Sequence, residues 1–521
     1  MKYNKLLIAA LAIFTITSCV DLDTTPEGGT TTKDQKDEVA KYDPSKLDAD
    51  VNAMYGNLII FGTTSTTTTT YHNDFGYPAA CMFLDATGQD VVAPNTGYNW
   101  FSAGLDFSDR VYTSRVNTFL WRFFYNQIKA ANDLISSLPA DTEDPLAKAY
   151  LGQGYVNRAF GYFSLIQAWQ FNYVGNESKP GIPIILWDDP VEKTANNPRA
   201  TVEEVYDLIL NDLKTGIQLL EGFRRDDNSI VDQRVAYGMR ARVNLVMQKW
   251  ADAASDAAKA KTGFSPYSRT AVAKPAFNNA ANNQSWIWGA IISETNDVVK
   301  TGIINWPSHL CSMTGNGYTS ATGTHRMINS ALWAQIPSTD VRKGWWVDDK
   351  LHSANVNDAV AGDYGFTPYT NVKFGAYKDE IGQSTNASDW PMMRVEEMIL
   401  IEAEGLAMSG QIAPAKALLE GFIKANRDPN YTCAAASATA FQDEVWFQRR
   451  VELWGEGFSY YDIMRLKKPI IRKGTNFSED VQFNIPAEDK ILLYRIPSEE
   501  INANNGISEE DNNEAVPAPT V

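Results

Sequence analysis

Paired amphipathic helices are the feature that most constrains how this chain can fold. Residues 202–220 place apolar side chains at three- and four-residue steps, which indicates a helix with one buried face. Thr201 lies three residues before Glu204, so a capping box is predicted at the start of this helix. Residues 234–247 and 250–261 form two more helical segments with a very short turn between them, and the alanines of the second segment allow close packing.

Other segments extend this pattern along the chain. They are residues 117–138 with 146–170, residues 393–408 with 414–426, and a last long helix over 441–466. We therefore expect a mainly α-helical protein, in which about four tetratricopeptide-like helix pairs form a right-handed superhelical scaffold. Two regions, near 62–112 and 262–391, lack long periodic segments, so loop-rich insertions carrying short strands are predicted there.

The N-terminal residues have the features of an export signal. Lys2 and Lys5 precede an apolar run over residues 6–16, which is too short to span a bilayer as a helix. The following Ile-Thr-Ser-Cys, which ends at Cys19, resembles a bacterial lipobox, in which the cysteine becomes the acylated first residue. We predict a signal peptide over 1–18 and lipid attachment at Cys19. An ordinary signal peptide with an incidental cysteine is the alternative.

The residues that follow divide into a tether and a folded domain. Residues 19–43 are rich in Thr, Asp, Lys and Gly, and we predict a flexible tether there. Asp21 and Asp23 within it resemble the export tag that sends Bacteroidetes lipoproteins to the cell surface. Residues 44–521 are predicted to form the folded domain.

The amino-acid composition indicates which partners and which disulfide bonds to expect. The formal net charge is −17, so the surface repels nucleic acid and anionic headgroups, and no nucleic-acid partner is expected. A hydrophobic content of 44% is typical of a globular protein. Besides Cys19, the cysteines are too few and odd in number for a disulfide framework; they are Cys81, Cys311 and Cys433.

Several motifs are similar to those of a known family. Residues 446–465, WFQRRVELWGEGFSYYDIMR, resemble the C-terminal hallmark of the SusD/RagB family of surface nutrient-binding lipoproteins. Three more segments support this resemblance: residues 158–169, 390–410 and 496–505. Gln448 and Ser459 stand where the family usually has glutamate and arginine, which indicates a divergent branch.

The resemblance implies a location, a ligand and a partner. It implies a lipid-anchored lipoprotein on the surface of the outer membrane that binds oligosaccharides or polysaccharides. It also implies a SusC-like TonB-dependent outer-membrane transporter, which the protein covers as a lid and to which it delivers the glycan. Two alternatives remain open at this point: a peptide-binding lid of a similar transporter, and a helical-repeat scaffold for protein–protein recruitment.

Charged residues of these motifs lie on helices that are expected to be packed. Buried charges persist when they are paired, so we interpret these residues as ion pairs that lock the C-terminal helices and not as catalytic groups. They are Glu397, Glu404, Arg450, Glu452 and Arg465. Arg158 is given the same structural role.

The predicted ligand contacts are aromatic. Sugar rings present flat C–H faces, and Trp or Tyr offers a rigid apolar plate to them. Trp100 lies among glycines, in a segment with no helical period. The candidate ligand-binding residues are Tyr98, Asn99, Trp100, Trp306, Tyr318, Trp333 and Trp345. Core packing is the competing interpretation for each tryptophan, and at most one of the adjacent pair Trp345 and Trp346 is expected to be exposed.

The sequence lacks the common catalytic and metal-binding motifs. HExxH, GxSxG and GxxxxGK[ST] do not occur, and the four histidines lack the i, i+4 spacing of a metal pair. Among 63 acidic residues, neighbours such as Asp188 and Asp189 are expected by chance. We therefore predict a binding protein that is not an enzyme, without a cofactor or a metal site.

Overall fold

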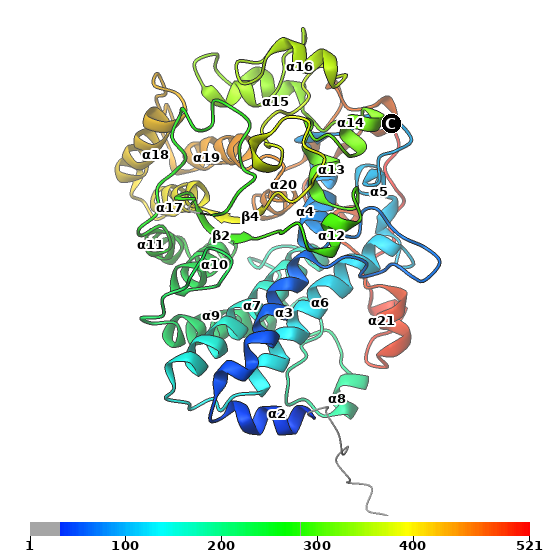
Figure 1. Ribbon diagram of the computed structural model, residues 1–521, viewed down its shortest axis with the longest axis vertical. Coiled ribbons are helices and arrows are strands. Elements are labelled where there is room, and N and C mark those ends of the chain that lie inside the picture. Colours follow the sequence, from blue (N-terminus) through cyan, green and yellow to red (C-terminus); the bar gives the residue numbers. More distant parts are fainter. Residues whose placement is uncertain (1–31, 282) are drawn as a thin grey trace, which may run out of the picture.

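The computed structural model describes residues 32–281 and 283–521, and this part of the chain is mainly α-helical (Figure 1). The predicted signal peptide, Cys19 and most of the predicted tether lie outside the described residues. The long helices are α6 (Arg115–Ser136), α7 (Pro145–Trp169), α9 (Val202–Leu219), α10 (Gln233–Val246), α11 (Trp250–Ala260), α17 (Val395–Met408), α18 (Ile412–Asn426) and α19 (Ala438–Glu452). Each packs on the next from α6 to α18, and α19 packs on α17. The predicted stack of paired helices is confirmed.

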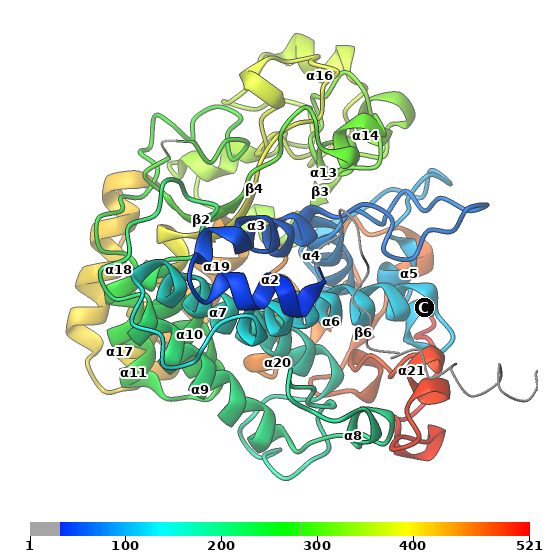
Figure 2. The same ribbon diagram turned by 60° about the horizontal axis from the view of Figure 1, so that its bottom comes forward.

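Shorter elements surround this stack. The short helices are α2 (Lys33–Ala40), α3 (Asp48–Gly56), α4 (Tyr77–Thr87), α5 (Ser102–Leu105), α8 (Val191–Ala195), α12 (Asp297–Lys300), α13 (Trp306–Leu310), α14 (Tyr318–Thr322), α15 (Ser330–Gln335), α16 (Asp358–Asp363), α20 (Ser459–Arg465) and α21 (Ser498–Ala503). Three antiparallel two-stranded ladders pair β1 (Val91–Val92) with β3 (Met327–Ile328), β2 (Trp286–Ala290) with β4 (Trp390–Arg394), and β5 (Ile470–Ile471) with β6 (Asn484–Ile485). The insertion that carries α13 to α16 lies at one end of the molecule in both views (Figures 1 and 2).

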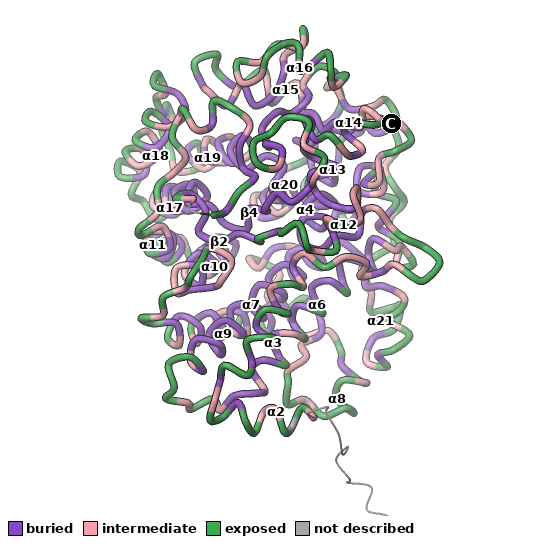
Figure 3. The backbone as a smooth tube through the Cα atoms, in the orientation of Figure 1, coloured by how far each residue is buried: buried purple, intermediate pink, exposed green. Residues whose placement is uncertain are grey.

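Close backbone packing joins the two halves of the stack. α11 contacts α17, although the loop-rich insertion separates them in sequence. A Cβ atom at Gly405 of α17 would lie 2.6 Å from the carbonyl oxygen of Trp250 and 3.0 Å from the Cβ of Ala254. Small residues at this crossing therefore let the two helices approach, as the alanines of α11 predicted. Figure 3 shows that the buried residues follow these inner helices, whereas exposed residues lie mainly on the outer loops.

The predicted flexible tether is too long at its C-terminal end. Residues 33–40 form α2, which begins with a capping box between Thr32 and Gln35. Ala40 is fully buried in a small core that includes Leu134 of α6 and Leu151 of α7. The polar composition concealed this helix, because its stability comes from the cap and from the docking of one small residue.

The predicted single helix over 441–466 is wrong. The structure breaks it into α19 and α20, with a turn between them that contains Gly455 at φ 77° and Gly457 at φ 89°. These are left-handed conformations, which glycine adopts without a steric penalty. A Cβ atom at Gly457 would lie 2.6 Å from the Sγ atom of Cys81 in α4, so the turn also needs glycine for close approach.

A buried ion network holds the C-terminal helices against the insertion. It contains four acids and four bases that are all buried: Asp340, Glu396, Glu452, Glu456, Arg342, Lys373, Arg394 and Arg427. Burial alone would raise the pKa of Glu452, but the guanidiniums around it, that of Arg427 first, hold this pKa well below its usual value. Removing one member would leave its partners buried and unpaired, which is costly.

The remaining charged residues of the family motifs are also paired, as predicted. The pairs are Glu397 with Arg242, Glu404 with Arg465, and Arg450 with Asp90, each at 2.6 Å, and Arg158 with Asp212 at 2.8 Å. The acids of these pairs are fully or almost fully buried. The motif residues therefore fix the packing of the helices.

Candidate ligand-binding site

Three rings from distant parts of the chain meet at the surface, and we call His72, Trp100 and Tyr318 the aromatic platform. The His72 ring stacks on Trp100, with 4.8 Å between ring centroids and 15° between ring planes. Tyr318 meets His72 at 5.8 Å and Trp100 at 6.3 Å, edge-on in both cases. All three residues are partly exposed, and Tyr98 beside them is 55% exposed. The platform thus presents aromatic faces and edges to solvent.

The β1–β3 ladder brings these segments together. Val91 pairs with Ile328, so the chain that leaves β1 toward Trp100 runs beside the chain that enters β3 from Tyr318. A hydrogen bond of 2.7 Å between the hydroxyls of Thr96 and Thr324 joins the two segments again nearer the platform. In Figure 1 the loops next to α5 and α14 accordingly lie at the same side of the molecule.

Buried groups support the platform from below. The His309 ring stacks on Tyr318 at 4.7 Å and on Phe75 at 5.5 Å, and its Nε2 donates to the carbonyl oxygen of His72 at 2.8 Å. Burial, followed by the nearby Arg326 charge, lowers the pKa of His309 to about 3, so this ring is neutral at physiological pH. The stacked rings therefore connect the surface to the core.

A glycine lets the Tyr318 segment approach its support. A Cβ atom at Gly317 would lie 2.5 Å from the Cα of Ser308, in the helix α13 that also carries His309. Because backbone cannot move aside, only glycine fits here. The Ser308 hydroxyl then accepts the N–H of Tyr318 at 3.2 Å, which fixes the start of α14.

Polar groups next to the rings are also held in place. The Oδ1 atom of Asn99 accepts hydrogen bonds from the Arg326 guanidinium at 2.9 Å and from the backbone N–H of Phe101 at 3.2 Å. The side-chain amide of Asn73 donates to the carbonyl oxygen of Trp100. A ligand would therefore meet aromatic rings and an amide whose orientations are set before it binds, which reduces the entropic cost of binding.

Four of the predicted contacts come together at this surface: Tyr98, Asn99, Trp100 and Tyr318. Two others are wrong as ligand contacts, because Trp306 is 1% and Trp345 0% exposed. Their indole N–H groups donate to backbone carbonyls, Trp306 to Ser388 at 2.8 Å and Trp345 to Val272 at 2.9 Å. Both side chains are core residues of the insertion.

Trp333 and Trp346 are the remaining tryptophans on which the sequence made a prediction. Trp333 is partly buried, and it packs beneath the Lys343 ammonium at 4.1 Å and beside Tyr369 at 5.4 Å, so it makes no ring contact with the platform. At most one of the adjacent tryptophans was expected to be exposed, and Trp346, like Trp345, is buried. Its ring packs edge-on against Trp454 at 5.4 Å.

Sequence reasoning missed the partly exposed His72 and the exposed Trp187. His72 follows the threonine-rich loop, and no spacing rule connects it with Trp100 or Tyr318, so only the three-dimensional contact identifies it. Trp187, 53% exposed, lies four residues before α8, and α8 is at the end of the molecule opposite to α14 (Figures 1 and 2). The turn residues Asp188, Asp189 and Pro190 that follow it were the available signal.

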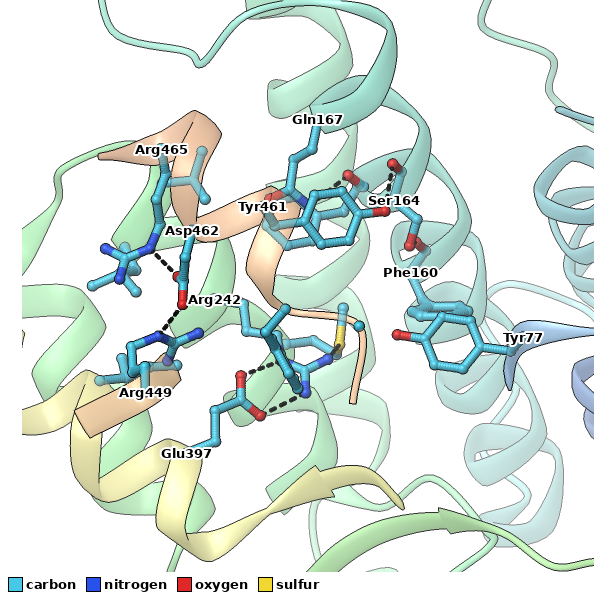
Figure 4. Close-up of a pocket in the computed structure, with 17 residues that line it drawn as sticks. Tyr77, Phe160, Ser164, Gln167, Arg242, Glu397, Arg449, Tyr461, Asp462 and Arg465 are labelled. Carbon is cyan, nitrogen blue, oxygen red and sulfur yellow. Dashed lines mark hydrogen bonds and ion pairs between the residues drawn. The ribbon is translucent and has the colours of Figure 1, made fainter. Parts of the chain in front are cut away.

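A cavity away from the platform, between α7, α10, α17 and α20, is lined by ion pairs (Figure 4). Arg242 faces Glu397, and Asp462 accepts from Arg449 at 2.7 Å and from Arg465 at 2.6 Å. The cavity volume is about 50 Å³. A single water molecule needs about 10–15 Å³ by this measure, so there is room for a few waters and none for a sugar ring.

The described residues also bear on metal binding, membrane crossing and disulfide bonds. Within residues 32–281 and 283–521, no three His, Cys, Asp or Glu side chains are grouped so that they could hold a metal ion. The same part of the chain has no helix of the length and apolar character needed to cross a bilayer. Cys81, Cys311 and Cys433 are buried and form no disulfide with one another.

Comparisons with known proteins agree with this architecture. The family described as "Starch-binding associating with outer membrane" matches residues 41–245, and the SusD family matches residues 311–513. The SusD-like protein P38 of Formosa agariphila is 23% identical over 388 residues, which cover 67% of this chain and 72% of that protein.

Solved structures show the same fold. A SusD-like carbohydrate binding protein from Bacteroides vulgatus superposes with a TM-score of 0.73 at 23% identity, covering 90% of this chain and 98% of the other. A SusD superfamily protein from Bacteroides thetaiotaomicron gives 0.70 at 20% identity, covering 90% and 99%. Together with the two family matches, which span most of the chain, these similarities show that the protein belongs to the SusD/RagB family.

Proposed function

We propose that this protein captures oligosaccharides or polysaccharides at the aromatic platform, on the surface of the outer membrane. The stacked pair of His72 and Trp100, partly exposed to solvent above buried rings, is the observation that carries this proposal. Family membership supports it, as does the carbohydrate binding named for the relative from Bacteroides vulgatus. A pyranose ring laid on the platform would bury C–H groups against rigid rings, at a low cost in side-chain entropy.

The rest of the proposal concerns delivery. We infer that Cys19 carries the lipid anchor, and that the protein hands its ligand to a SusC-like TonB-dependent transporter as a lid over the pore. A tethered binding protein raises the local ligand concentration at the transporter entrance. The description of the family that matches residues 41–245, which names the outer membrane, supports this location.

Isothermal titration against a panel of polysaccharides tests the proposal. The wild type is expected to bind at least one glycan, and Trp100→Ala to weaken that binding at least about tenfold, because exposed aromatic plates dominate such contacts. Trp187→Ala is the control, since it removes a surface indole that is 53% exposed and lies four residues before α8, at the opposite end of the molecule from α14. A panel without any glycan binder refutes the proposal, and binding of peptides alone favours the peptide-lid alternative.

A further inference from the structure

The two segments that build the aromatic platform contain few of the acidic side chains that are frequent elsewhere in the chain. The platform is built by residues 62–103 and 305–329, and the second segment contains no Asp or Glu. The first contains three, and all are buried: Asp74, Asp85 and Asp90. In a protein with 63 acids and a net charge of −17, these two segments therefore expose no carboxylate.

An unpaired positive charge lies directly below the platform. Arg326 is 2% exposed, and its guanidinium donates to the side-chain oxygen of Asn99 at 2.9 Å and to the carbonyl of Thr324 at 3.5 Å. Among the described residues it forms no ion pair, whereas buried arginines such as Arg158 and Arg394 have carboxylate partners. Burial lowers the pKa of Arg326 to about 10, so the group remains charged at neutral pH.

Arg326 also determines what Asn99 offers to a ligand. The Asn99 oxygen is occupied by Arg326 and by the N–H of Phe101, so the amide nitrogen is directed away from them. This NH₂ group has two donors and no acceptor. Asn99 is partly exposed and adjoins Trp100, so these donors lie at the edge of the platform with a positive charge behind them.

A second guanidinium lies on the other flank. Arg115 donates to the side-chain oxygen of Asn73 at 2.6 Å and to the Thr64 hydroxyl at 3.1 Å, and it lies 4.2 Å over the ring of Tyr71. Asn73 in turn bonds the carbonyl of Trp100. The Asp74 carboxylate makes its hydrogen bonds with Thr63 and Thr64, and within the described residues Arg115 forms no ion pair.

We propose that the platform selects anionic glycans, that is, sugars that carry carboxylate or sulfate groups; this inference rests on the proposed glycan-binding function. Two guanidinium charges without ion-pair partners, outward amide donors and two segments that expose no carboxylate of their own make the platform less acidic than the rest of the protein. An oxyanion on the sugar accepts hydrogen bonds from Asn99 more strongly than a neutral hydroxyl does. The Asp74 carboxylate shares the Thr64 hydroxyl with Arg115 and offsets part of the Arg115 charge, whereas burial alone shifts the pKa of Arg326.

Titration with matched ligand pairs tests this selectivity. The pairs are oligogalacturonate with its methyl ester, and a sulfated oligosaccharide with its desulfated form. We expect at least one anionic member to bind about tenfold or more tightly than its neutral partner, as one charge-assisted hydrogen bond implies. A carboxylate-specific or a sulfate-specific result supports the proposal and identifies which oxyanion is recognised.

A pair of variants separates the site from general charge effects. Asn99→Asp keeps the side-chain shape, gains an ion pair with Arg326, and replaces the outward donors by a negative oxygen, so it should lose the preference for the anionic ligand. Asn505→Asp adds the same charge at an exposed position beyond α21 and should keep the preference. Equal binding of charged and neutral glycans, or an Asn99→Asp variant that still prefers anions, overturns the proposal while glycan capture stands. Absence of all glycan binding removes the proposed function itself.

Discussion

The buried histidine below the platform leads to a quantitative prediction about pH. In the unfolded chain His309 has a pKa of about 6.5, whereas burial lowers its pKa to about 3 in the folded protein. A histidine with a lowered folded pKa stabilises the fold in its neutral form, so its contribution is present above about pH 6.5 and is lost as the pH falls below that value. Near pH 5 only the unfolded chain protonates it.

The size of the effect follows from the unfolded pKa. Going from about pH 7.5 to about pH 5 covers about 1.5 pH units below the unfolded pKa, and each unit corresponds to about 1.4 kcal/mol, so this histidine alone costs about 2 kcal/mol of stability. The variant His309→Gln has no titrating group at this position. It should be less stable than the wild type at pH 7.5, and this deficit should shrink by about 2 kcal/mol at pH 5.

Urea unfolding of the two proteins at both pH values measures this change. The comparison with the wild type is essential, because other groups oppose the effect: burial raises the pKa of Asp85 to about 7 and that of Asp109 to about 6, and both changes favour folding as the pH falls. These contributions cancel in the difference between variant and wild type. If the deficit of His309→Gln were equal at both pH values, the buried, neutral state assigned to this ring would be refuted.

Three other perturbations have defined outcomes. Asp85→Asn should show the opposite pH dependence to His309→Gln. Urea unfolding should show its stability relative to the wild type falling by about 2 kcal/mol from pH 7.5 to pH 5. No change between these pH values would contradict the raised pKa of Asp85. Glu452→Gln removes the negative charge that pairs with Arg427 and its neighbours, and chemical denaturation should show a loss of about 3–5 kcal/mol in the free energy of unfolding. A loss below about 1 kcal/mol would show that the network does not depend on this carboxylate. Gly457→Ala, at φ 89° and against Cys81, should lower the melting temperature, whereas Gly421→Ala, in open space on α18, should raise it slightly, and equal shifts would be inconsistent with the strained turn.

The helical periodicity was informative because it depends on local rules. Residues 202–220 predicted α9 with its capping box, and the structure has both. The prediction failed where a single long-range contact decides the outcome. The apolar spacing of residues 441–466 continues across Gly455 and Gly457, but the approach of α4 at Cys81 favours a turn there. The same holds for α2, which is stable because Ala40 docks on α6 and α7.

At the site, too, long-range contacts decide what the local sequence does not. Trp100 and Trp306 both lie in segments rich in small and polar residues, and their sequences alone predict similar exposure. Trp306 is buried because Phe374 and Trp390 pack around it and Ser388 accepts its N–H. Trp100 stays at the surface because the ladder of β1 with β3 holds its loop beside Tyr318.

The amino-acid sequence by itself therefore determined the class of fold, the helix pairs, the role of the motif charges as ion pairs and the family, since these depend on periodicity and on residue type. Only the tertiary structure decided which aromatic rings face solvent, that His72 joins Trp100 and Tyr318, and that Arg326 lies unpaired below Asn99. The physical reason is that the exposure and charge environment of a side chain are set by residues that are distant in sequence, and no local pattern records which of them will be its neighbours.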